Sequence, residues 1–369
     1  MNLLLTYSFS SLAGGIHNWI ANNLGSGLAA SVVEMVIAGI SLLVFLVPLC
    51  FFLGYMERKV AAFMQMRLGP NRVGPKGSMQ IVADTVKLLF KEGLTPTASD
   101  RFLFNLAPVI VVVACMLVMA PIAFAKDFQM WDLSIGVLYV TSVSSIGVIG
   151  ILMAGWSSYN KYSLLGAMRS GAQIVSYELS IGLSILSVIV LTGDLQMSKI
   201  VESQANGWWI FKGHIPIMIS FVIFIIASTA EINRAPFDLT EAEQELTGGF
   251  HTEYSGMKFA MFLLAEYINL FVVSAIAATL FLGGWMPFHA GHWAGNWGAS
   301  FNHIMDFIPS SIWFLGKTFF IIFLIMQFRW TFPRLRVDQL LTLEWKYLLP
   351  ISMVNILLVT LMAIMGWHF

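Results

Sequence analysis

MISFVIFIIASTAE, residues 218–231, is an almost uninterrupted apolar stretch that ends in a carboxylate. A helix needs about 20 predominantly apolar residues to cross the hydrocarbon core of a bilayer. The window around this stretch, 214–232, is one of eight that meet this requirement. The other windows are 29–54, 102–125, 134–156, 174–192, 259–283, 311–329 and 347–367. The sequence therefore predicts an all-α integral membrane protein with about eight transmembrane helices.

The composition supports a membrane protein. Of the 369 residues, 58% are hydrophobic and only 11% are charged, whereas about 25% of an average soluble domain is charged. A soluble chain of this length could not cover its surface with so few charges. We therefore expect residues 29–369 to form a single polytopic membrane domain. The net charge of zero argues against a nucleic-acid partner, which would favour a basic face.

The distribution of Lys and Arg predicts the orientation, because cytoplasmic loops carry an excess of both. The loops after the first, third, fifth and seventh spans hold 16 of the 20 Lys and Arg residues. We therefore place these loops on the inner side and both termini outside. Residues 1–28 contain neither Lys nor Arg, so they lack the basic region of a signal peptide. They are predicted to form a retained extracytoplasmic segment.

Sequence motifs for nucleotides, redox centres and metals do not occur. The chain contains neither GxGxxG nor GxxxxGK[ST]. Cys50 and Cys115 both lie in apolar runs, without a CxxC motif or a Cys/His cluster nearby. They are interpreted as inert core thiols. We therefore expect this chain to bind no flavin, iron–sulfur cluster or metal.

The first inner loop has two parts of different character. LGPNRVGPKG, residues 68–77, is rich in Gly and Pro and is predicted not to be helical. In SMQIVADTVKLLFKEG, residues 78–93, charged and apolar side chains fall on different helical faces. Such a pattern predicts an amphipathic inner-surface helix. This helix either lies in the membrane interface or packs against a soluble partner.

Carboxylates within the predicted spans are the first candidates for function. An ionisable group at the centre of a span costs about 2.5–3.5 kcal/mol on insertion scales, so it marks a functional site by default. Four residues qualify: Glu34, Glu178, Glu231 and Glu266. A desolvated carboxyl group can exchange protons near neutral pH. The alternative for each is a structural hydrogen bond to a neighbouring helix.

Two inner loops carry opposite charges. The loop after the fifth span holds the acids Asp238, Glu241, Glu243, Glu245 and Glu253. Helix capping accounts for only part of this series. The loop after the seventh span places three arginines beside aromatic residues: Arg329, Arg334 and Arg336 with Trp330, Phe332 and Trp345. This combination suits an amphipathic ligand with a polar head and an apolar tail, and positive-inside anchoring with an aromatic belt is the alternative.

Five stretches together resemble one family, the H subunits of respiratory complex I, which includes the mitochondrial NADH dehydrogenase subunit 1 type. They are QMRLGPNRVGPKGSMQIVADTVKLLFKE (65–92), WSSYNKYSLLGAMRSGAQIVSYELSIGL (156–183), AEINRAPFDLTEAEQELTGGFHTEYSG (230–256), LAEYINLF (264–271) and PRLRVDQLLTLEWKYLLP (333–350). The resemblance extends from about residue 50 to residue 360. The membrane subunit of energy-converting hydrogenases is similar in fold, but the complete GPNRVGP and PRLRVDQL elements favour the quinone-linked family. Thr247 stands where this family more often has an aliphatic residue.

The resemblance implies a function that the residues alone do not assign. In this family the subunit joins the membrane arm of the complex to the peripheral arm and forms much of a quinone tunnel. The peripheral arm supplies the NADH, flavin and iron–sulfur chemistry, so no complete active site is expected in this chain alone. The implied partners are other complex I subunits, membrane lipid and a quinone, either ubiquinone or menaquinone. The implied location is the bacterial inner membrane, with the mitochondrial inner membrane as the alternative.

Roles for individual residues also follow from the resemblance. The family's path of acids, which links the quinone site to proton translocation, matches Glu178, Glu231, Glu243, Glu245, Glu253 and Glu266. Asp238 and Glu241, which belong to the same acidic loop, complete the predicted proton path. The quinone tunnel and its entrance match Arg58, Arg67, Arg72, Phe237, Arg334 and Arg336. Two other classes of protein are weighed against this one. An independent proton or cation antiporter would also carry acids within its spans, and a structural anchor would need the carboxylates only for assembly.

Overall fold

The computed structural model describes residues 15, 28–126, 128–205, 207–238, 248–289, 302–303 and 305–367. The chain divides into two compact units, Met1–Gly54 and Tyr55–Phe369. The predicted segment 1–28 and the predicted single domain 29–369 stay predictions. The three acids Glu241, Glu243 and Glu245 lie outside the described residues.

Eight helices among the described residues are long and apolar enough to cross a membrane, which confirms the predicted number. Seven of them are α2 (Leu28–Met64), α4 (Arg101–Val118), α5 (Gly136–Ser157), α6 (Lys161–Thr192), α9 (His214–Glu231), α11 (Gly256–Phe281) and α13 (Ser310–Thr331). The eighth consists of α14 (Val337–Thr342), a π-helical stretch η4 (Leu343–Leu348) and α15 (Leu349–Met365). The position of both termini outside the membrane stays a prediction.

Three helices extend beyond their predicted windows, because hydropathy marks the end of an apolar run and not the end of a helix. Helix α2 continues past residue 54 to Met64, through the charged residues Glu57 and Arg58. Helix α6 begins at Lys161 and not at residue 174. The residue before this helix, Asn160, caps it, because its side chain accepts a hydrogen bond from the backbone N–H of Tyr162 at 2.9 Å. The last span begins at 337 and not at 347.

Helix α4 is shorter than its window, which extended to residue 125. It ends at Val118 and is followed by a short antiparallel pair, β1 (Ala123–Ala125) and β2 (Phe128–Gln129). Pro121 lies between helix and strand and cannot donate a backbone hydrogen bond. This pair is a small addition to a fold that is otherwise almost entirely helical in the described residues.

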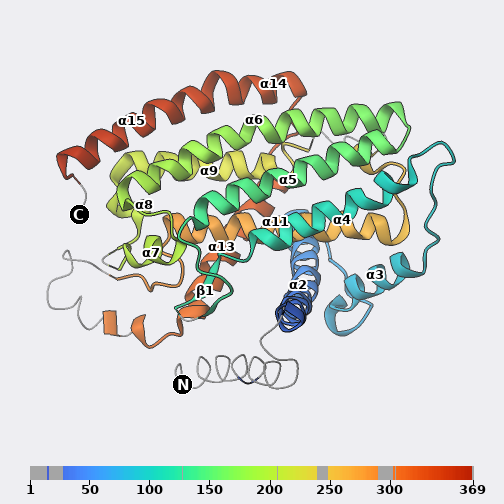
Figure 1. The fold of residues 1–369 in the computed structure, drawn as a ribbon, viewed down its shortest axis with the longest axis horizontal. Helices are drawn as coiled ribbons and strands as arrows, with labels where there is room; N and C mark the ends of the chain where they lie inside the picture. Colours follow the sequence, from blue (N-terminus) through green and yellow to red (C-terminus); the bar gives the residue numbers. More distant parts are fainter. Residues whose placement is uncertain are drawn as a thin grey trace. The chain divides into compact units, whose positions relative to one another are not determined.

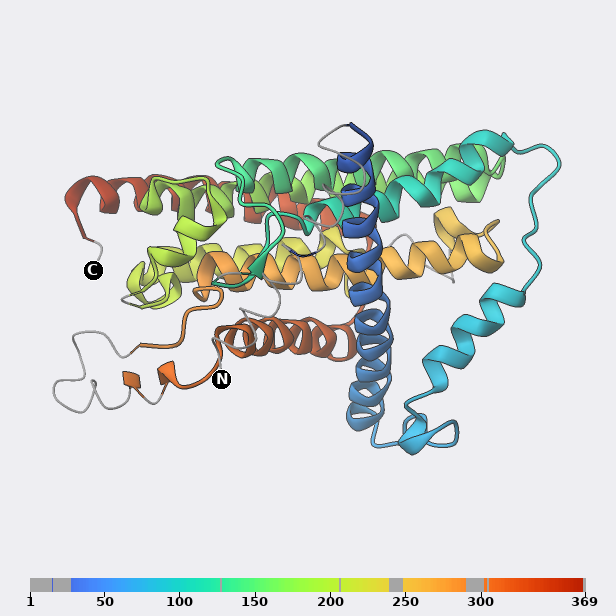
Figure 2. The same ribbon diagram turned by 60° about the horizontal axis from the view of Figure 1, so that its bottom comes forward.

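The spans of the second unit pack side by side. Helix α5 packs between α4 and α6, α6 also contacts α9 and α15, and α11 contacts α4 and α13. Figures 1 and 2 show α5, α6 and α9 running nearly parallel. Close approach depends on small residues, as is common between helices in membranes. A Cβ added at Gly166 of α6 would lie 2.7 Å from the Cα of Gly249, which belongs to η2 (Gly249–His251).

The first inner loop contains the predicted amphipathic helix, α3 (Gln80–Phe90), which packs against α11. Val86, Leu89 and Phe90 on this helix are exposed, with Phe90 88% exposed in the isolated chain. The preceding stretch is not α-helical, as predicted, apart from one 3-10 turn, η1 (Pro75–Gly77). Gly77 has a positive φ of 80°, and a Cβ there would lie 2.1 Å from the carbonyl oxygen of Pro70.

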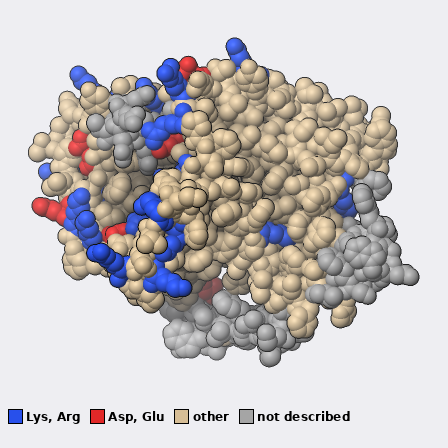
Figure 3. All heavy atoms as spheres, turned by 180° about the vertical axis from the view of Figure 1, so that it is seen from behind, with Lys and Arg blue, Asp and Glu red and all other residues tan. Residues whose placement is uncertain are grey.

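Charged side chains are unevenly distributed over the surface. In Figure 3 most of the blue and red side chains gather on the left, and most of the remaining described surface is tan. That side corresponds to the right of Figure 1, where α3, the start of α4 and the α5–α6 connection lie. These segments belong to the loops that the Lys and Arg count places on the inner side.

The remaining short helices, α7 (Met197–Glu202) and α8 (Trp209–Lys212), lie between α6 and α9 along the chain. Lys317 of α13 lies close to this region and is buried, with 6% of the residue exposed. Its ammonium group donates to three carbonyl oxygens after the end of α11: Leu282 at 2.5 Å, Gly284 at 2.9 Å and Met286 at 2.6 Å. The ring of Trp208 is 4.4 Å from the same nitrogen. Lys317 therefore stabilises the turn that follows α11 through these three hydrogen bonds.

Candidate functional site

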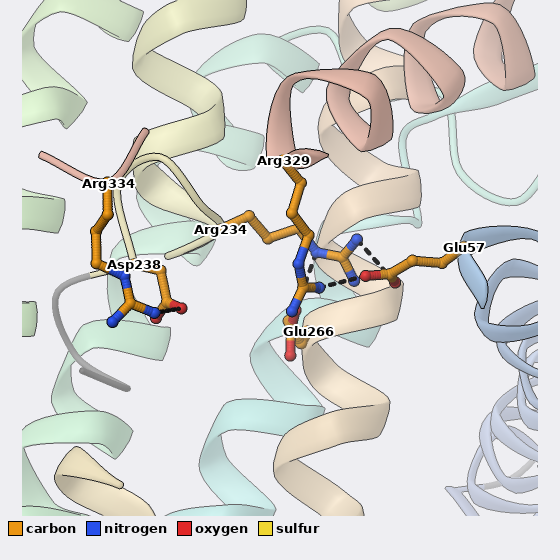
Figure 4. Close-up of polar contacts among 6 residues, drawn as sticks. All are labelled: Glu57, Arg234, Asp238, Glu266, Arg329 and Arg334. Atoms are coloured by element: carbon orange, nitrogen blue, oxygen red, sulfur yellow. Dashed lines mark hydrogen bonds and ion pairs between the residues drawn. The ribbon is translucent and has the colours of Figure 1, made fainter. Parts of the chain in front are cut away.

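Four charged side chains of the second unit form an ion-pair cluster in which Glu57 and Arg234 are buried and the other two are partly exposed: Glu57, Arg234, Glu266 and Arg329 (Figure 4). Nη1 of Arg234 lies 3.1 Å from Oε2 of Glu57, and Nε of Arg234 donates to Oε1 of Glu266 at 2.9 Å. Arg329 donates to the other oxygen of Glu57. The centre of the Tyr267 ring lies 5.1 Å from the Arg234 guanidinium carbon. Every charge in the cluster therefore has an opposite charge beside it.

Two helix ends supply the arginines of this cluster, and two helix interiors supply the carboxylates. Arg234 comes three residues after the end of α9, and Arg329 lies in the last turn of α13. Glu57 lies in the part of α2 that belongs to the second unit, and Glu266 lies within α11. Positive groups are favourable near the carboxyl ends of helices, where unpaired carbonyl groups concentrate negative potential. The cluster thus connects four helices through opposite charges.

Burial makes this cluster sensitive to the loss of any member. The side chain of Arg234 is 1% exposed and that of Glu57 is 7% exposed. Burial acts to lower the pKa of Arg234, but the negative charges of Glu57 and Glu266 raise the pKa by more, so that it is raised overall. Arg234 therefore remains a cation at any physiological pH. Removing one member of such a pair typically costs about 3–5 kcal/mol, because it leaves a buried charge uncompensated.

Two neighbouring cavities connect the predicted intramembrane carboxylates. A cavity of about 460 Å³ is bounded by α5, α6, α9 and α11, and its mostly apolar lining includes Glu178, Glu231 and Asn269. A smaller cavity of about 80 Å³ is lined by Glu231, Glu266 and Asn269 among other residues. Because Glu231 and Asn269 line both cavities, the structure places Glu231 between Glu178 and Glu266.

Each of these three carboxylates has a different environment. Glu178 accepts a hydrogen bond from the hydroxyl group of Ser145 on α5. Glu266 belongs to the ion-pair cluster, through Arg234. Glu231 is the last residue of α9 and faces the two cavities. Glu178, at one end of the series, therefore has a hydroxyl partner, and Glu266, at the other end, has a cation as its partner.

A histidine also lines the smaller cavity. His251 packs against the rings of Phe250 and Phe259, with ring centres 5.0 and 5.3 Å away. Burial lowers the pKa of His251 to about 4. His251 is therefore neutral near pH 7, and the cavity gains no positive charge from it. The sequence analysis did not single out this residue.

The loops after α9 and α13 meet beside α6. Asp238 accepts a hydrogen bond from Nη2 of Arg334 at 2.9 Å, and the backbone N–H of Leu335 donates to the carbonyl oxygen of Pro236 at 3.1 Å. Nε2 of Gln173 on α6 donates to the carbonyl oxygens of Ala230 and Phe237, both at 2.8 Å. Figure 4 shows the Asp238–Arg334 pair apart from the ion-pair cluster. Two of the predicted quinone-site residues, Phe237 and Arg334, thus belong to one junction.

The other residues predicted to bind quinone are not part of this junction. Arg58 pairs with Asp84 of α3 at 2.6 Å, and both side chains are 40% or more exposed. Arg67 donates to the side chain of Gln65 at 2.6 Å. Arg72 and Arg336 are exposed, and the backbone N–H of Arg336 donates to Gln339. The structure therefore brings only part of the predicted set together.

Two further acidic candidates lie elsewhere. Glu253 accepts a hydrogen bond from Nδ2 of Asn160 at 2.6 Å and lines a shallow pocket with Tyr159 and Lys161. Glu34 lies in α2, in the first unit. Among the described residues, no group of three or more His, Cys, Asp or Glu side chains is arranged to hold a metal ion. Cys50 and Cys115 are both buried.

Sequence reasoning missed Glu57, the acid that pairs with both arginines of the cluster. Its predicted span ended at residue 54, so Glu57 was counted as part of a loop. The continuity of the helix provides a signal that could have revealed it, because neither Gly nor Pro occurs between residues 55 and 68. Glu344 was missed for the corresponding reason, since its window began at residue 347.

Comparison with known proteins places the chain in a family. Residues 37–360 match the family model described as NADH dehydrogenase. The chain is 55% identical over 363 residues to the H subunit of the NADH-quinone oxidoreductase of Bacteroides fragilis, an alignment that covers 98% of this chain and 100% of the relative. This coverage includes most of residues 1–28, which lie outside the stretches that carried the sequence resemblance. The corresponding H subunit of Bacteroides thetaiotaomicron is 54% identical with the same coverage.

A more distant relative agrees with this placement. NADH-quinone oxidoreductase subunit 8 of Rhodothermus marinus is 51% identical over 312 residues, which cover 83% of this chain and 90% of the relative. The resemblance inferred from the five sequence stretches is confirmed. The chain therefore belongs to the NADH dehydrogenase family of membrane subunits of respiratory complex I, to which the H subunits of NADH-quinone oxidoreductase belong.

Proposed function

We propose that this chain forms much of the quinone-binding tunnel of an NADH-quinone oxidoreductase and couples quinone reduction to proton translocation through its buried carboxylates. The proposal rests on the family of the relatives and on one structural observation. Glu178, Glu231 and Glu266 follow one another around two neighbouring cavities, and Glu266 is tied to the ion-pair cluster. This arrangement provides a connected path for a change in charge.

The quinone head group would be held at the junction between the loops after α9 and α13. Arg334 offers a cation that is 42% exposed and whose partner, Asp238, is buried. Phe237 is buried beside it and packs against Tyr177, with ring centres 5.8 Å apart. A polar head and an apolar tail both find suitable groups there. Arg58, Arg67, Arg72 and Arg336 would line the approach to this junction.

Coupling would be electrostatic. Reduction of a quinone to a quinol takes up two electrons and two protons, and the quinol stays neutral. If the two protons come from Asp238 and the neighbouring loop acids, these carboxyl groups become ionised, so the charge of the loop changes during turnover. Arg234 lies only four residues from Asp238 and pairs with both Glu57 and Glu266. A change in charge on the loop shifts the balance between these two pairs. In a medium of low dielectric such a shift acts strongly on the next carboxyl group, Glu231.

Glu231 and Glu178 would then pass the change into the membrane interior. They line the same cavity, where a change of charge on one carboxyl group acts strongly on the other because the surroundings have a low dielectric. Ser145 holds Glu178 in place by a hydrogen bond. Asp238, Glu241, Glu243, Glu245 and Glu253 would supply the acidic surroundings at the loop end of the path. This sequence of events moves protons between carboxyl groups and requires no metal or flavin in this chain.

The proposed setting follows from the relatives. Other subunits of the complex would supply NADH oxidation, flavin and iron–sulfur clusters, and no complete active site would lie in this chain alone. The bacterial relatives and the apolar helices support the cell inner membrane as the location, with multiple spans. The exposed apolar face of α15, which includes Met353, Val354 and Leu357, would contact lipid or another membrane subunit.

A photoreactive quinone analogue tests the quinone site directly. In membranes that contain the intact complex, illumination should label peptides from residues 55–77, 232–255 or 329–341 of this chain. An excess of the unmodified quinone should prevent the labelling. Arg334→Met should weaken labelling and raise the KM for quinone, whereas Lys199→Met, which removes an exposed cation on α7, should change neither. Labelling confined to other subunits would contradict the proposed site.

A further inference from the structure

A buried carboxyl group in the last span stands outside the series described so far. Glu344 is 0% exposed and lies in the π-helical stretch η4. Its Oε1 accepts a hydrogen bond from the hydroxyl group of Ser180 on α6. Its Oε2 is buried and has no hydrogen-bond partner. Within the part of the chain that the structure describes, no Lys, Arg or His lies within ion-pair distance of it.

The local backbone explains why this carboxyl group points inward. Helices α14 and α15 form one continuous helix through η4, and Pro350 lies in the first turn of α15. Proline has no N–H to donate to the preceding turn, so the helix widens there. The buried positions of this span then recur every three or four residues: Leu340, Glu344, Leu348, Ser352, Asn355 and Val359. Glu344 therefore faces α6, on the same side as the apolar contacts of the span.

The charged and titratable groups around Glu344 do not neutralise it. On α6, Tyr177 donates its hydroxyl group to the carbonyl oxygen of Leu340 at 3.0 Å and not to Glu344. On the same span, Asp338 and Lys346 are exposed. The titratable groups of α9 are His214, at its start, and Glu231, at its end, and Glu231 faces the cavity that it shares with Glu178. A buried carboxylate without a cation is strongly disfavoured, whereas a protonated carboxyl group carries no charge and costs much less to bury.

Glu344 and Glu178 lie on opposite sides of α6. Ser180, which contacts Glu344, is two residues from Glu178 in the same helix, and two residues correspond to a rotation of about 200°. Glu178 accepts its hydrogen bond from Ser145 on α5. Glu344 lies on the last span and accepts its hydrogen bond from Ser180 on α6. The carboxyl group of Glu344 is thus separate from the cavities that hold the other three.

A small pocket lies about one helical turn from this group. Its volume is about 210 Å³, and it is lined by Arg169 and Gln173 of α6 and by Leu340 and Leu341 of α14. Leu340 precedes Glu344 by four residues, which is about one helical turn. π-Helical turns are frequent at functional sites, because they leave backbone groups and side chains in positions that a regular helix does not allow.

We propose that Glu344 is a proton-binding site at the interface between α6 and the last span, on the opposite face of α6 from Glu178. The reaction is the addition of one proton to a carboxylate oxygen and its later release, with no other reactant. The pocket beside Leu340 provides access to the loop side, and Ser180 orients the group. This site does not depend on the proposed quinone tunnel. Proton binding at Glu344 can be measured without turnover of the complex, so its test is separate from the test of the tunnel.

Infrared difference spectroscopy of the intact purified complex tests the proposal without turnover. Spectra recorded as a function of pH should contain a protonated-carboxyl C=O band that moves in heavy water and is lost in Glu344→Gln. Glu202→Gln, which alters an exposed carboxyl group on α7, should leave that band in place. An unchanged set of protonated-carboxyl bands in Glu344→Gln would overturn the proposal.

A second variant keeps the test decisive where Glu344→Gln does not assemble. Ser180→Ala retains the carboxyl group and removes its hydrogen-bond partner. The C=O band should then shift to higher frequency, as expected for a carboxyl group that has lost a hydrogen bond. A band that stays in place in Ser180→Ala would also overturn the proposal.

Turnover distinguishes proton binding from a purely structural role. Glu344→Gln should change the shape of the pH profile of NADH–quinone activity per assembled complex, and Glu344→Asp should restore the original shape. A structural role alone predicts less assembled complex with an unchanged profile. That result, together with an unchanged infrared spectrum, would assign Glu344 to packing only.

Discussion

Nε of Arg234 and Oε1 of Glu266 lie 2.9 Å apart, and this contact ties the loop after α9 to α11. The same guanidinium group faces Glu57 on a third helix. Arg234 therefore holds two carboxylates at once, and one of them belongs to the intramembrane series. In the proposed mechanism, the balance between these two pairs couples the loop to the membrane interior.

Removing Arg234 should destabilise the protein more than removing an exposed arginine. Arg234→Met leaves Glu266 without its cation, and we expect a loss of about 3–5 kcal/mol in the free energy of unfolding. Arg58→Met, whose pair with Asp84 is 44% and 40% exposed, should cost less than about 1 kcal/mol. The amount of assembled complex and its thermal unfolding midpoint report both changes.

The double variant Arg234→Met, Glu266→Gln checks the cause of that loss. If the loss comes from an uncompensated buried charge, the second substitution should recover a large part of the stability. No recovery would show that Arg234 acts through packing, for example against Tyr267, and not through its charge.

Two glycines on the same helix should respond differently to the same substitution. Gly166→Ala would place a Cβ 2.7 Å from the Cα of Gly249, so α6 and η2 must separate. We expect a loss of about 1–3 kcal/mol from this overpacking. Gly182→Ala meets no atom within 4 Å and should be neutral or stabilising by up to about 1 kcal/mol. Equal thermal unfolding midpoints for the two variants would contradict the packing described for α6.

The buried His251 should make stability depend on acid pH. Its pKa is lowered by burial to about 4 from an ordinary value of 6.5. The unfolded chain therefore binds a proton between these values and the folded chain does not. The free energy of unfolding should therefore keep its full value above pH 6.5. It should fall by up to about 3 kcal/mol as the pH falls toward 4, because protonation of His251 favours the unfolded chain.

His251→Phe should remove this dependence and leave a flatter stability curve below pH 6.5. Thermal unfolding midpoints of the complex measured from neutral to acid pH provide the comparison. A variant with the same acid dependence as the parent chain would place the titrating group elsewhere.

Lys317 should matter for stability and not for quinone binding. Lys317→Met leaves two buried carbonyl oxygens, those of Leu282 and Gly284, and the partly buried one of Met286 without their donor. Leaving a buried polar group unsatisfied costs about 1–3 kcal/mol each, so we expect a loss of several kcal/mol. The amount of assembled complex should fall while the KM for quinone of the remaining complex is unchanged. A raised KM at normal assembly would contradict this assignment.

The number and order of the spans follow from hydropathy, because apolar runs of bilayer length leave few alternatives. The buried charges do not follow from it. Glu57 and Glu344 both lie just outside their predicted windows, since a window is ended by the charged residue that it meets. Hydropathy windows therefore leave out buried acids of two kinds. The first kind is neutralised by a cation on another helix, and the second accepts a hydrogen bond from another helix.

The pairing of residues far apart in sequence could not be predicted either. Nothing in the sequence around Arg234 marks it as buried, and the structure places it between Glu57 and Glu266. Glu178, Glu231 and Glu266 were each recognisable from their positions within spans. Their connection through two cavities required the packing of α9 against α6 and α11. Tertiary packing therefore supplies what residue type and spacing do not.

In the proposed mechanism Glu231 connects the loop side of the path to the membrane interior, and Glu231→Gln removes this connection at a single residue. The substitution keeps size and hydrogen bonding but removes the exchangeable charge. The measurement is the number of protons moved per NADH oxidised by the intact complex in sealed vesicles, with Glu202→Gln as the control. We predict normal assembly, NADH–quinone turnover reduced about tenfold or more, equivalent to at least about 1.4 kcal/mol, and reduced proton movement. Full turnover with normal proton movement in Glu231→Gln would contradict this mechanism.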